Sequence, residues 1–430
     1  MTFTVTMLDA TEILDSRGRP TLSVLLRLAD GTSAVAGVPA GASTGTREAV
    51  ELRDGDTTRY QGAGVQKARA HVSGELADLL RSRTWDSLAE ADTAMNDLDA
   101  TGTKSRLGAN AVTGCSLALA RALARSAGRE LHTYLAPPGV APRLPVPHFN
   151  VLNGGAHAPN PLDFQEFMIA PVGAPSLPEA ICAGAEIYAA LRKRLYEAGH
   201  TTGLGDEGGF APDITRPEDA LHMIVAAIMD AGYTPGRTTV AIALDPAASG
   251  FRQPDGSYLV AGESLSSDDM IARYEQIVAD FPVWSIEDGL GEDDTAGWQR
   301  LTAALGTGIQ LVGDDNFVTN PAIITRAITD HIANAALIKV NQIGTVTETL
   351  DAMAVCRDAR YAAMISHRSG ETPDTFIADL AVATGCGQIK SGAPARGERV
   401  AKYNRLLAIA AAHPEIPYGL PDEQPSSPGR

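Results

Sequence analysis

The second half of the chain contains six apolar segments that each end in a polar residue able to take part in catalysis. These polar residues are Asp245, Glu287, Asp314, Lys339, His367 and Lys390. They are spaced 23 to 42 residues apart, which leaves room for one helix and its loops after each segment. The spacing predicts strand–helix units whose strands run parallel. Because the carboxyl ends of parallel barrel strands meet at one mouth, we predict an enzyme with its active site there.

The three acidic residues among the six suggest a metal site. Asp245, Glu287 and Asp314 offer hard carboxylate oxygens with no Cys or His beside them, a donor set that suits Mg²⁺ or Mn²⁺ better than zinc. Alternatively, each acid caps the helix that follows its strand. Three carboxylates in one mouth repel one another unless a cation is present, which favours the metal.

Two lysines follow the acids. A lysine beside a divalent cation and a second ammonium has a lowered pKa, so Lys339 or Lys390 could act as a base. The alternative is a structural salt bridge to one of the acids, which needs only one lysine. The second lysine favours binding of a substrate anion.

The fifth segment ends in His367-Arg368-Ser369. A guanidinium and a hydroxyl at a barrel mouth are suited to a phosphate group. Earlier in the chain, the glycine turn 205–209 contains Glu207 and could hold it in a cavity as a general acid, or be an ordinary loop. The small-residue loop 39–45 could be a lid or a phosphate cradle, but the segment taken alone favours a plain linker.

Composition excludes several classes of function. Against 35 Lys and Arg there are 52 Asp and Glu, giving a net charge of −17 without a basic cluster. Nucleic acid and anionic membranes are therefore not expected partners. Four separated cysteines, the lack of an export signal and the absence of a long apolar run predict a cytoplasmic protein with reduced thiols.

The elements that must position these residues fall into two domains. Residues 1–40 alternate apolar and polar side chains, which predicts a three-stranded antiparallel sheet, and residues 62–135 follow with helical periodicity. A proline-rich connector then precedes an irregular stretch at 150–155, two helices and the six strand–helix units. We therefore expect an α+β domain at 1–136, an α/β barrel at 143–412 and an irregular tail at 413–430.

The chain resembles the enolase family from its first strand to about residue 409. The matching segments include ILDSRG (13–18), GASTG (41–45), GDEGGFAP (205–212), SIED (285–288), GDD (313–315), KVNQIGT (339–345), SHRSGET (366–372) and IKSGAPAR (389–396). The resemblance implies a (β/α)8-like barrel behind an N-terminal α+β capping and dimerisation domain. It also implies the dehydration of 2-phosphoglycerate to phosphoenolpyruvate in glycolysis, by a homodimer or higher homo-oligomer.

The resemblance assigns each residue a role. Two Mg²⁺ ions would bind, the first to Asp245, Glu287 and Asp314 and the second with the help of Ser43. Lys339 would remove the α-proton, Glu207 would protonate the departing hydroxyl, and Glu166 would position that hydroxyl. The implied substrate-binding residues are His157, Gln165, His367, Arg368, Ser369 and Lys390, with Lys390 on the carboxylate and Arg368, Ser369 and His157 at the phosphate.

Three departures from the family pattern leave the substrate open. Ala40 begins the lid loop where serine is usual, Pro159 stiffens the loop after His157, and Asn316 replaces an apolar residue beside a metal-ligand strand. An alternative function is the same chemistry on a phosphonate relative, forming carboxyphosphonoenolpyruvate. A third is a non-catalytic binding or structural role, against which the complete set of acid and base residues argues.

Overall fold

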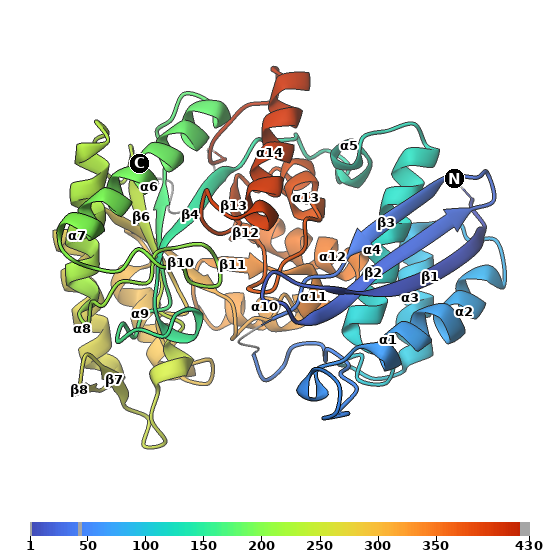
Figure 1. Ribbon diagram of the computed structural model, residues 1–430, viewed down its shortest axis with the longest axis horizontal. Helices are drawn as coiled ribbons and strands as arrows, with labels where there is room; N and C mark the ends of the chain where they lie inside the picture. Colours follow the sequence, from blue (N-terminus) through green and yellow to red (C-terminus); the bar gives the residue numbers. More distant parts are fainter. Residues whose placement is uncertain (1, 42–44, 422–430) are drawn as a thin grey trace.

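The computed structural model describes residues 2–41 and 45–421. Figure 1 shows an N-terminal sheet with its helices beside a barrel built from the rest of the chain. Strands β1 (Val5–Leu14), β2 (Pro20–Leu28) and β3 (Ser33–Gly37) form an antiparallel sheet in that order. The predicted three-stranded sheet is confirmed.

One face of this sheet packs against the long helix α4 (Ala109–Ser126). Leu22, Val24 and Leu26 alternate along β2 and are fully buried, as expected for a sheet with one covered face. A Cβ atom on Gly114 would lie 2.5 Å from Val24, so only glycine lets helix and strand approach this closely.

The remaining helical segments of this part of the chain are shorter. They are η1 (Tyr60–Gly62), α1 (Gln66–His71), the π-helical turn η2 (Val72–Leu76), α2 (Ala77–Arg81), α3 (Leu88–Asp99) and α5 (Leu131–Leu135). All of these except η1 lie within residues 62–135, where the sequence predicts helical periodicity.

Eight strands close into the barrel. They are β4 (Val146–Asn153), β5 (Glu166–Ala170), β6 (Ala241–Asp245), β9 (Val283–Glu287), β10 (Gln310–Gly313), β11 (Ala335–Ile338), β12 (Ala362–Ser366) and β13 (Gln388–Lys390). The last six run parallel, as predicted, and β5 is antiparallel to both its neighbours. Every residue of these strands is buried, which explains their continuous apolar runs.

Helices surround the barrel. They are α6 (Leu177–Glu197), α7 (Pro217–Asp230), α8 (Ser267–Asp280), α9 (Thr295–Leu305), α10 (Pro321–Thr329), α11 (Val340–Ile343), α12 (Val346–Asp358), α13 (Phe376–Thr384) and α14 (Gly397–Ala412). Helices α9, α10, α12, α13 and α14 each begin soon after a barrel strand ends, so these strand ends open into loops at one mouth.

Two expectations about the barrel need correction or extension. The stretch 150–155, expected to be irregular, contains the end of β4 because its Leu and Val side chains are buried in the barrel. The interval between Asp245 and Glu287 holds more than one helix: η4 (Ala248–Phe251) and a hairpin of β7 (Tyr258–Val260) and β8 (Glu263–Leu265) precede α8.

The first part of the predicted tail is irregular but anchored. The Leu144 amide donates to the Pro417 carbonyl at 2.8 Å, and the Tyr418 hydroxyl donates to the Pro171 carbonyl at 2.8 Å. Residues 422–430 lie outside the described residues. Within the described parts of the chain, no helix is both long enough and apolar enough to cross a membrane.

Candidate active site

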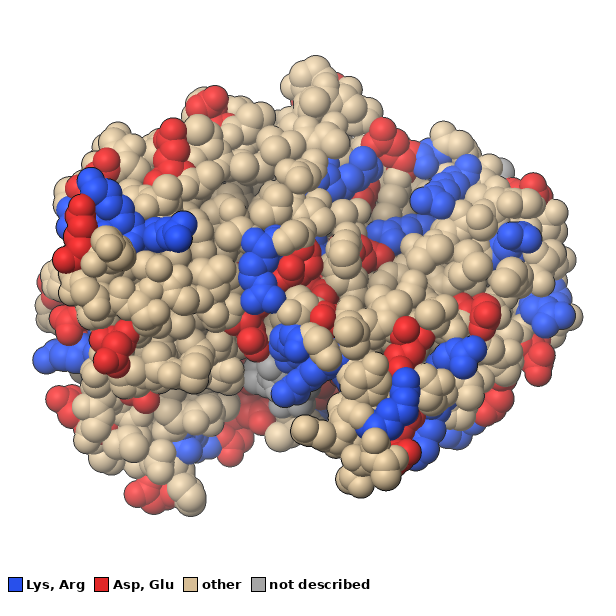
Figure 2. Space-filling view, viewed as in Figure 1, with Lys and Arg blue, Asp and Glu red and all other residues tan. Residues whose placement is uncertain are grey.

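Except for Glu287, the described residues predicted for the site line one cavity at the carboxyl ends of the barrel strands. Its lining residues are His157, Gln165, Glu166, Glu207, Asp245, Ala247, Asp288, Asp314, Asp315, Lys339, Ser366, His367, Arg368, Ser369 and Lys390. Figure 2 shows basic and acidic side chains gathered along the junction between the barrel and the N-terminal sheet. The predicted metal ligand Ser43 lies outside the described residues.

Lys390, the last residue of β13, stands at the centre of the acidic groups. Its Nζ lies 3.0 Å from Glu166 Oε1, 3.0 Å from Asp245 Oδ2 and 2.8 Å from Glu287 Oε1. Burial opposes the charged form, but the three carboxylates outweigh it and raise the pKa of Lys390 well above its usual range. The ammonium therefore stays charged.

The acidic strand ends provide a donor set that fits a hard divalent cation. Burial, followed by repulsion from Asp245, raises the pKa of Glu287 well above its usual value. Its Oε2 is buried and makes no hydrogen bond to any described residue. A second acidic group, Asp288, Asp314 and Asp315, brings three carboxylate oxygens within 4.8 Å of one another. Oxygen-only donors of this kind suit Mg²⁺ or Mn²⁺.

Asp288 was not predicted as a site residue, although it stands in the SIED motif. Its two carboxylate oxygens accept from the Asp314 and Asp315 amides, each at 2.9 Å. Asp288 therefore fixes the backbone that carries Asp314. Its position directly after Glu287 was the only signal in the sequence.

Lys339 directly follows β11 and contacts Asp314 Oδ2. Burial lowers the Lys339 pKa, but the Asp314 carboxylate outweighs it and the net shift is upward. The expected lowering applies to a lysine beside a divalent cation; in this structure Lys339 makes the alternative contact, a salt bridge to one of the acids. Apart from Asp314, burial, Arg368 and Lys390 lower the Lys339 pKa, whereas Glu287 raises it.

The glycine turn holds Glu207 inside the cavity, where the side chain is 3% exposed. Gly205 and Gly209 close the turn through a 2.8 Å backbone hydrogen bond. The Glu207 carboxylate accepts from Asn150 Nδ2 at 3.0 Å and lies 3.1 Å from His367 Nε2. The turn was predicted either to hold Glu207 in a cavity or to be an ordinary loop. The geometry fits the first interpretation.

His367 is oriented by a residue that was not predicted, Arg399, near the start of α14. Arg399 Nη1 lies 2.5 Å from His367 Nδ1. Because a guanidinium can only donate, Nδ1 must accept, and the ring proton is on Nε2, which faces Glu207. Burial lowers the pKa of His367 to about 3, so the ring is neutral.

Glu166 and Glu207 behave as a coupled pair. Burial and the Glu207 charge raise the pKa of Glu166 well above its usual range. Burial also raises the pKa of Glu207, but His367 and His157 outweigh it and the net shift is downward. The pair therefore retains one proton at a pH where an isolated glutamate has lost it.

The predicted phosphate-binding residues lie together, and one of them already has a partner. Ser369 Oγ is 3.1 Å from His157 Nε2. The Arg368 guanidinium donates to Glu48 at 2.8 Å and to Asn341 at 3.0 Å. Glu48 follows the lid loop, so the N-terminal part of the chain contributes directly to this site.

The three departures have different surroundings. Ala40 is buried and exchanges two backbone hydrogen bonds with Gly370, at 2.8 and 2.9 Å, which fixes the start of the lid loop. Asn316 is buried but is not among the described side chains that line the cavity, and neither atom of its amide bonds to a described residue. Pro159 has an exposed position next to the buried Ala158.

A closed eight-stranded barrel with acidic strand ends and two mouth lysines defines an enzyme that combines a divalent cation with acid–base side chains. The model of the family described as "Enolase, N-terminal domain" matches residues 5–135, and that of "Enolase, C-terminal TIM barrel domain" matches residues 141–415. The chain is 55% identical to an enolase of Rubrobacter xylanophilus, over 93% of its own length and 92% of the relative's. The chain belongs to the enolase family and is a hydro-lyase.

Proposed function

We propose that this chain catalyses the reversible dehydration of 2-phosphoglycerate to phosphoenolpyruvate, with two Mg²⁺ ions in each active site. Membership of the enolase family supports the reaction. The observation that carries the proposal is the buried cavity that contains a candidate base, Lys339, and a candidate acid, Glu207. A proton removed at one carbon and a hydroxyl lost from the next need these two groups.

Asp245, Glu287 and Asp314 would hold the first cation and Ser43 would contribute to the second. When bound, the cations offset the negative charge that accumulates on the substrate carboxylate as its α-proton leaves. The unpartnered oxygen of Glu287 and the crowding of the acids support this assignment.

Lys339 is the proposed base. A neutral amine is required to accept the α-proton, and the Asp314 contact opposes it by favouring the ammonium. Lys339 must therefore leave Asp314 before it can act. Lys390 keeps its charge and is suited to hold the substrate carboxylate, where it stabilises the same negative charge.

Glu207 is the proposed acid. Hydroxide is a poor leaving group, so the departing oxygen needs a proton. The proton retained by the Glu166–Glu207 pair supplies it, with Glu166 holding the proton in the resting protein and positioning the hydroxyl. His157, Ser369 and Arg368 would meet the phosphate, while Gln165 and His367 complete the pocket wall.

The proposal is tested by following phosphoenolpyruvate absorbance when purified protein and Mg²⁺ are given 2-phosphoglycerate. We expect Mg²⁺-dependent turnover that stops when the cation is chelated. Absence of turnover with 2-phosphoglycerate, together with turnover of a phosphonate analogue, would reassign the substrate. Absence of turnover with both would leave only the non-catalytic role.

A second experiment separates the base from the acid. Exchange of the substrate α-proton with deuterated solvent requires the base alone, so Glu207→Gln should exchange without forming product. Lys339→Ala should do neither, and Glu186→Gln, an exposed glutamate variant, should behave as wild type. Exchange in Lys339→Ala at the wild-type rate would refute the assignment of the base.

We also propose that the protein acts in the cytoplasm as a homodimer or a larger homo-oligomer. The glycolytic reaction and the predominantly buried free cysteines support the location. Light scattering on the purified protein measures the assembly directly, and a mass of one chain would contradict it.

A further inference from the structure

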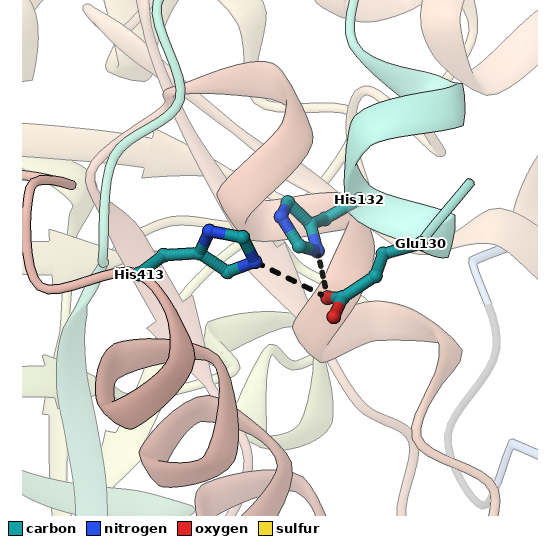
Figure 3. Close-up of side chains that lie close together, drawn as sticks. All are labelled: Glu130, His132 and His413. Carbon is teal, nitrogen blue, oxygen red and sulfur yellow. Dashed lines mark ion pairs between the residues drawn. The ribbon is translucent and has the colours of Figure 1, made fainter.

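Away from the catalytic cavity, two histidines and a glutamate converge where the N-terminal part of the chain meets the end of the barrel. Glu130 precedes α5, His132 lies on α5, and His413 directly follows α14. Figure 3 shows a nitrogen of each ring directed at the same carboxylate. The three candidate ligand atoms all lie within 4.8 Å of one another. We propose that these three side chains form a zinc site that joins the two parts of the chain.

The distances match a tetrahedral ion. Glu130 Oε2 lies 3.2 Å from His132 Nδ1 and 3.7 Å from His413 Nε2. Ligands about 2.0–2.1 Å from a zinc ion stand roughly 3.3 Å apart at tetrahedral angles. Two imidazoles and one carboxylate, with the fourth position left to water, form a ligand set that zinc uses and that magnesium does not favour.

The histidines lack the hydrogen bonds that a simple ion pair would give them. His132 is 3% exposed, and its Nδ1 makes no hydrogen bond with any residue that the structure describes. His413 Nε2 is likewise buried without such a bond. Both ring nitrogens therefore face one Glu130 oxygen without a hydrogen bond to it, and His132 Nδ1 also lies 3.8 Å from Asp379 Oδ1. A cation among these groups would satisfy them.

Neighbouring charged groups support an orientation of the His413 ring in which Nε2 is free to bind a metal. His413 Nδ1 lies 3.3 Å from Glu415, and a carboxylate there favours the proton on Nδ1 and leaves the Nε2 lone pair for a metal. Arg405 is the competing cation. It donates to Asp379 at 2.6 and 2.9 Å and stands 3.5 Å from Glu130, so its main partner is Asp379.

The site is separate from the reaction. Arg399, near the start of α14, contacts His367 in the catalytic cavity, whereas His413 follows the last residue of the same helix. At 1.5 Å per residue, the two positions lie about 21 Å apart along the axis. Zinc would therefore clamp α5 to the far end of α14 without entering the active site.

The test is a zinc titration of the full chain against a chromogenic chelator. Magnesium is kept in large excess, because the catalytic carboxylates also bind zinc. The variants His413→Gln and Glu130→Gln change half-buried or exposed side chains, and His200→Gln is the matched control at a histidine outside the cluster. We expect wild type and His200→Gln to bind one zinc ion more than the two site variants. The zinc affinity of wild type and His200→Gln at this site should exceed that of His413→Gln and Glu130→Gln by at least about 100-fold.

Thermal unfolding gives an independent measurement. Zinc at about 100 times its Kd should raise the midpoint of wild type by roughly 3 °C more than that of His413→Gln. Turnover with magnesium should be equal in all variants. Equal zinc stoichiometry in wild type and His413→Gln, or an equal thermal shift, would overturn the proposal.

Discussion

Two layers of side chains inside the same barrel differ in how completely their polar groups are satisfied. In the lower layer, Gln310 and Gln388 exchange side-chain hydrogen bonds of 2.9 and 2.8 Å across the interior. In the upper layer, Lys390 is surrounded by carboxylates, two of which keep a buried oxygen without a described partner. Gln388 and Lys390 are two residues apart on β13, so one strand face supplies both layers.

This difference separates the part of the barrel that holds its shape from the part that reacts. The neutral amides satisfy each other and need no ligand. In the charged layer, one oxygen of Glu166 and one of Glu287 make no hydrogen bond to a described residue, which leaves them available to a cation. We expect substitutions in the upper layer to affect catalysis and electrostatics, and those in the lower layer to affect only packing and stability.

The largest effect should come from the upper layer. Lys339→Ala should lower kcat by about 10⁴-fold, the upper end of the contribution of a general base. Steady-state kinetics with 2-phosphoglycerate measure this, and circular dichroism checks that the fold is retained. The exposed variant Lys193→Ala is the control. A loss in Lys339→Ala of less than tenfold would contradict the proposed division between the layers.

Replacing Lys390 should cost the most stability. Lys390→Met leaves Glu166, Asp245 and Glu287 without their shared ammonium, and loss of one partner of a buried ion pair costs about 3–5 kcal/mol. Urea unfolding in the presence of a chelator measures the loss. The loss should shrink at acidic pH because the carboxylates then take up protons. If the loss of stability in Lys390→Met is the same at pH 5 and pH 7.5, the unpaired carboxylate charges are not its cause.

Asp92 is a buried carboxyl group outside the barrel mouth. It tests whether stability can depend on pH without several carboxylates lying close together. Burial raises the pKa of Asp92 to about 6, from 3.8. Its contribution to stability is complete below pH 3.8 and is lost as the pH rises through 6, by about 3 kcal/mol in all.

About 1.4 kcal/mol of this loss falls between pH 5 and pH 7.5. Asp92→Asn is neutral throughout and can still accept from Thr347, so its unfolding free energy should vary by that much less over this interval. If Asp92→Asn and wild type show the same pH dependence of unfolding free energy, the raised pKa does not belong to Asp92.

The smallest effect is expected in the lower layer. Gln388→Leu leaves the Gln310 amide without this partner and should cost about 1–3 kcal/mol, while turnover per folded molecule stays unchanged. The double variant Gln310→Leu/Gln388→Leu should recover part of the loss, because both partners are then apolar. Additive losses in the double-mutant cycle would show that the two amides do not act as a pair.

The sequence predicted the charged layer better than its surroundings. Each strand-end residue follows an apolar run, so periodicity was enough to find it. Arg399 and Glu48 carry no such signal, because each meets its partner only after distant parts of the chain pack together. The direction of β5 was also unpredictable, since a buried apolar run has the same pattern in either direction. The Lys339 pKa depended on a contact with Asp314 that spacing alone does not reveal.

The ion pair between Glu48 and Arg368 joins the N-terminal part of the chain to the reacting cavity. Catalytic competence therefore depends on the two parts remaining assembled, and separation would disable the site while both remained folded. During gradual denaturation, turnover should disappear before helical structure is lost. Activity is thus the most sensitive gauge of how firmly the halves of this molecule are held together.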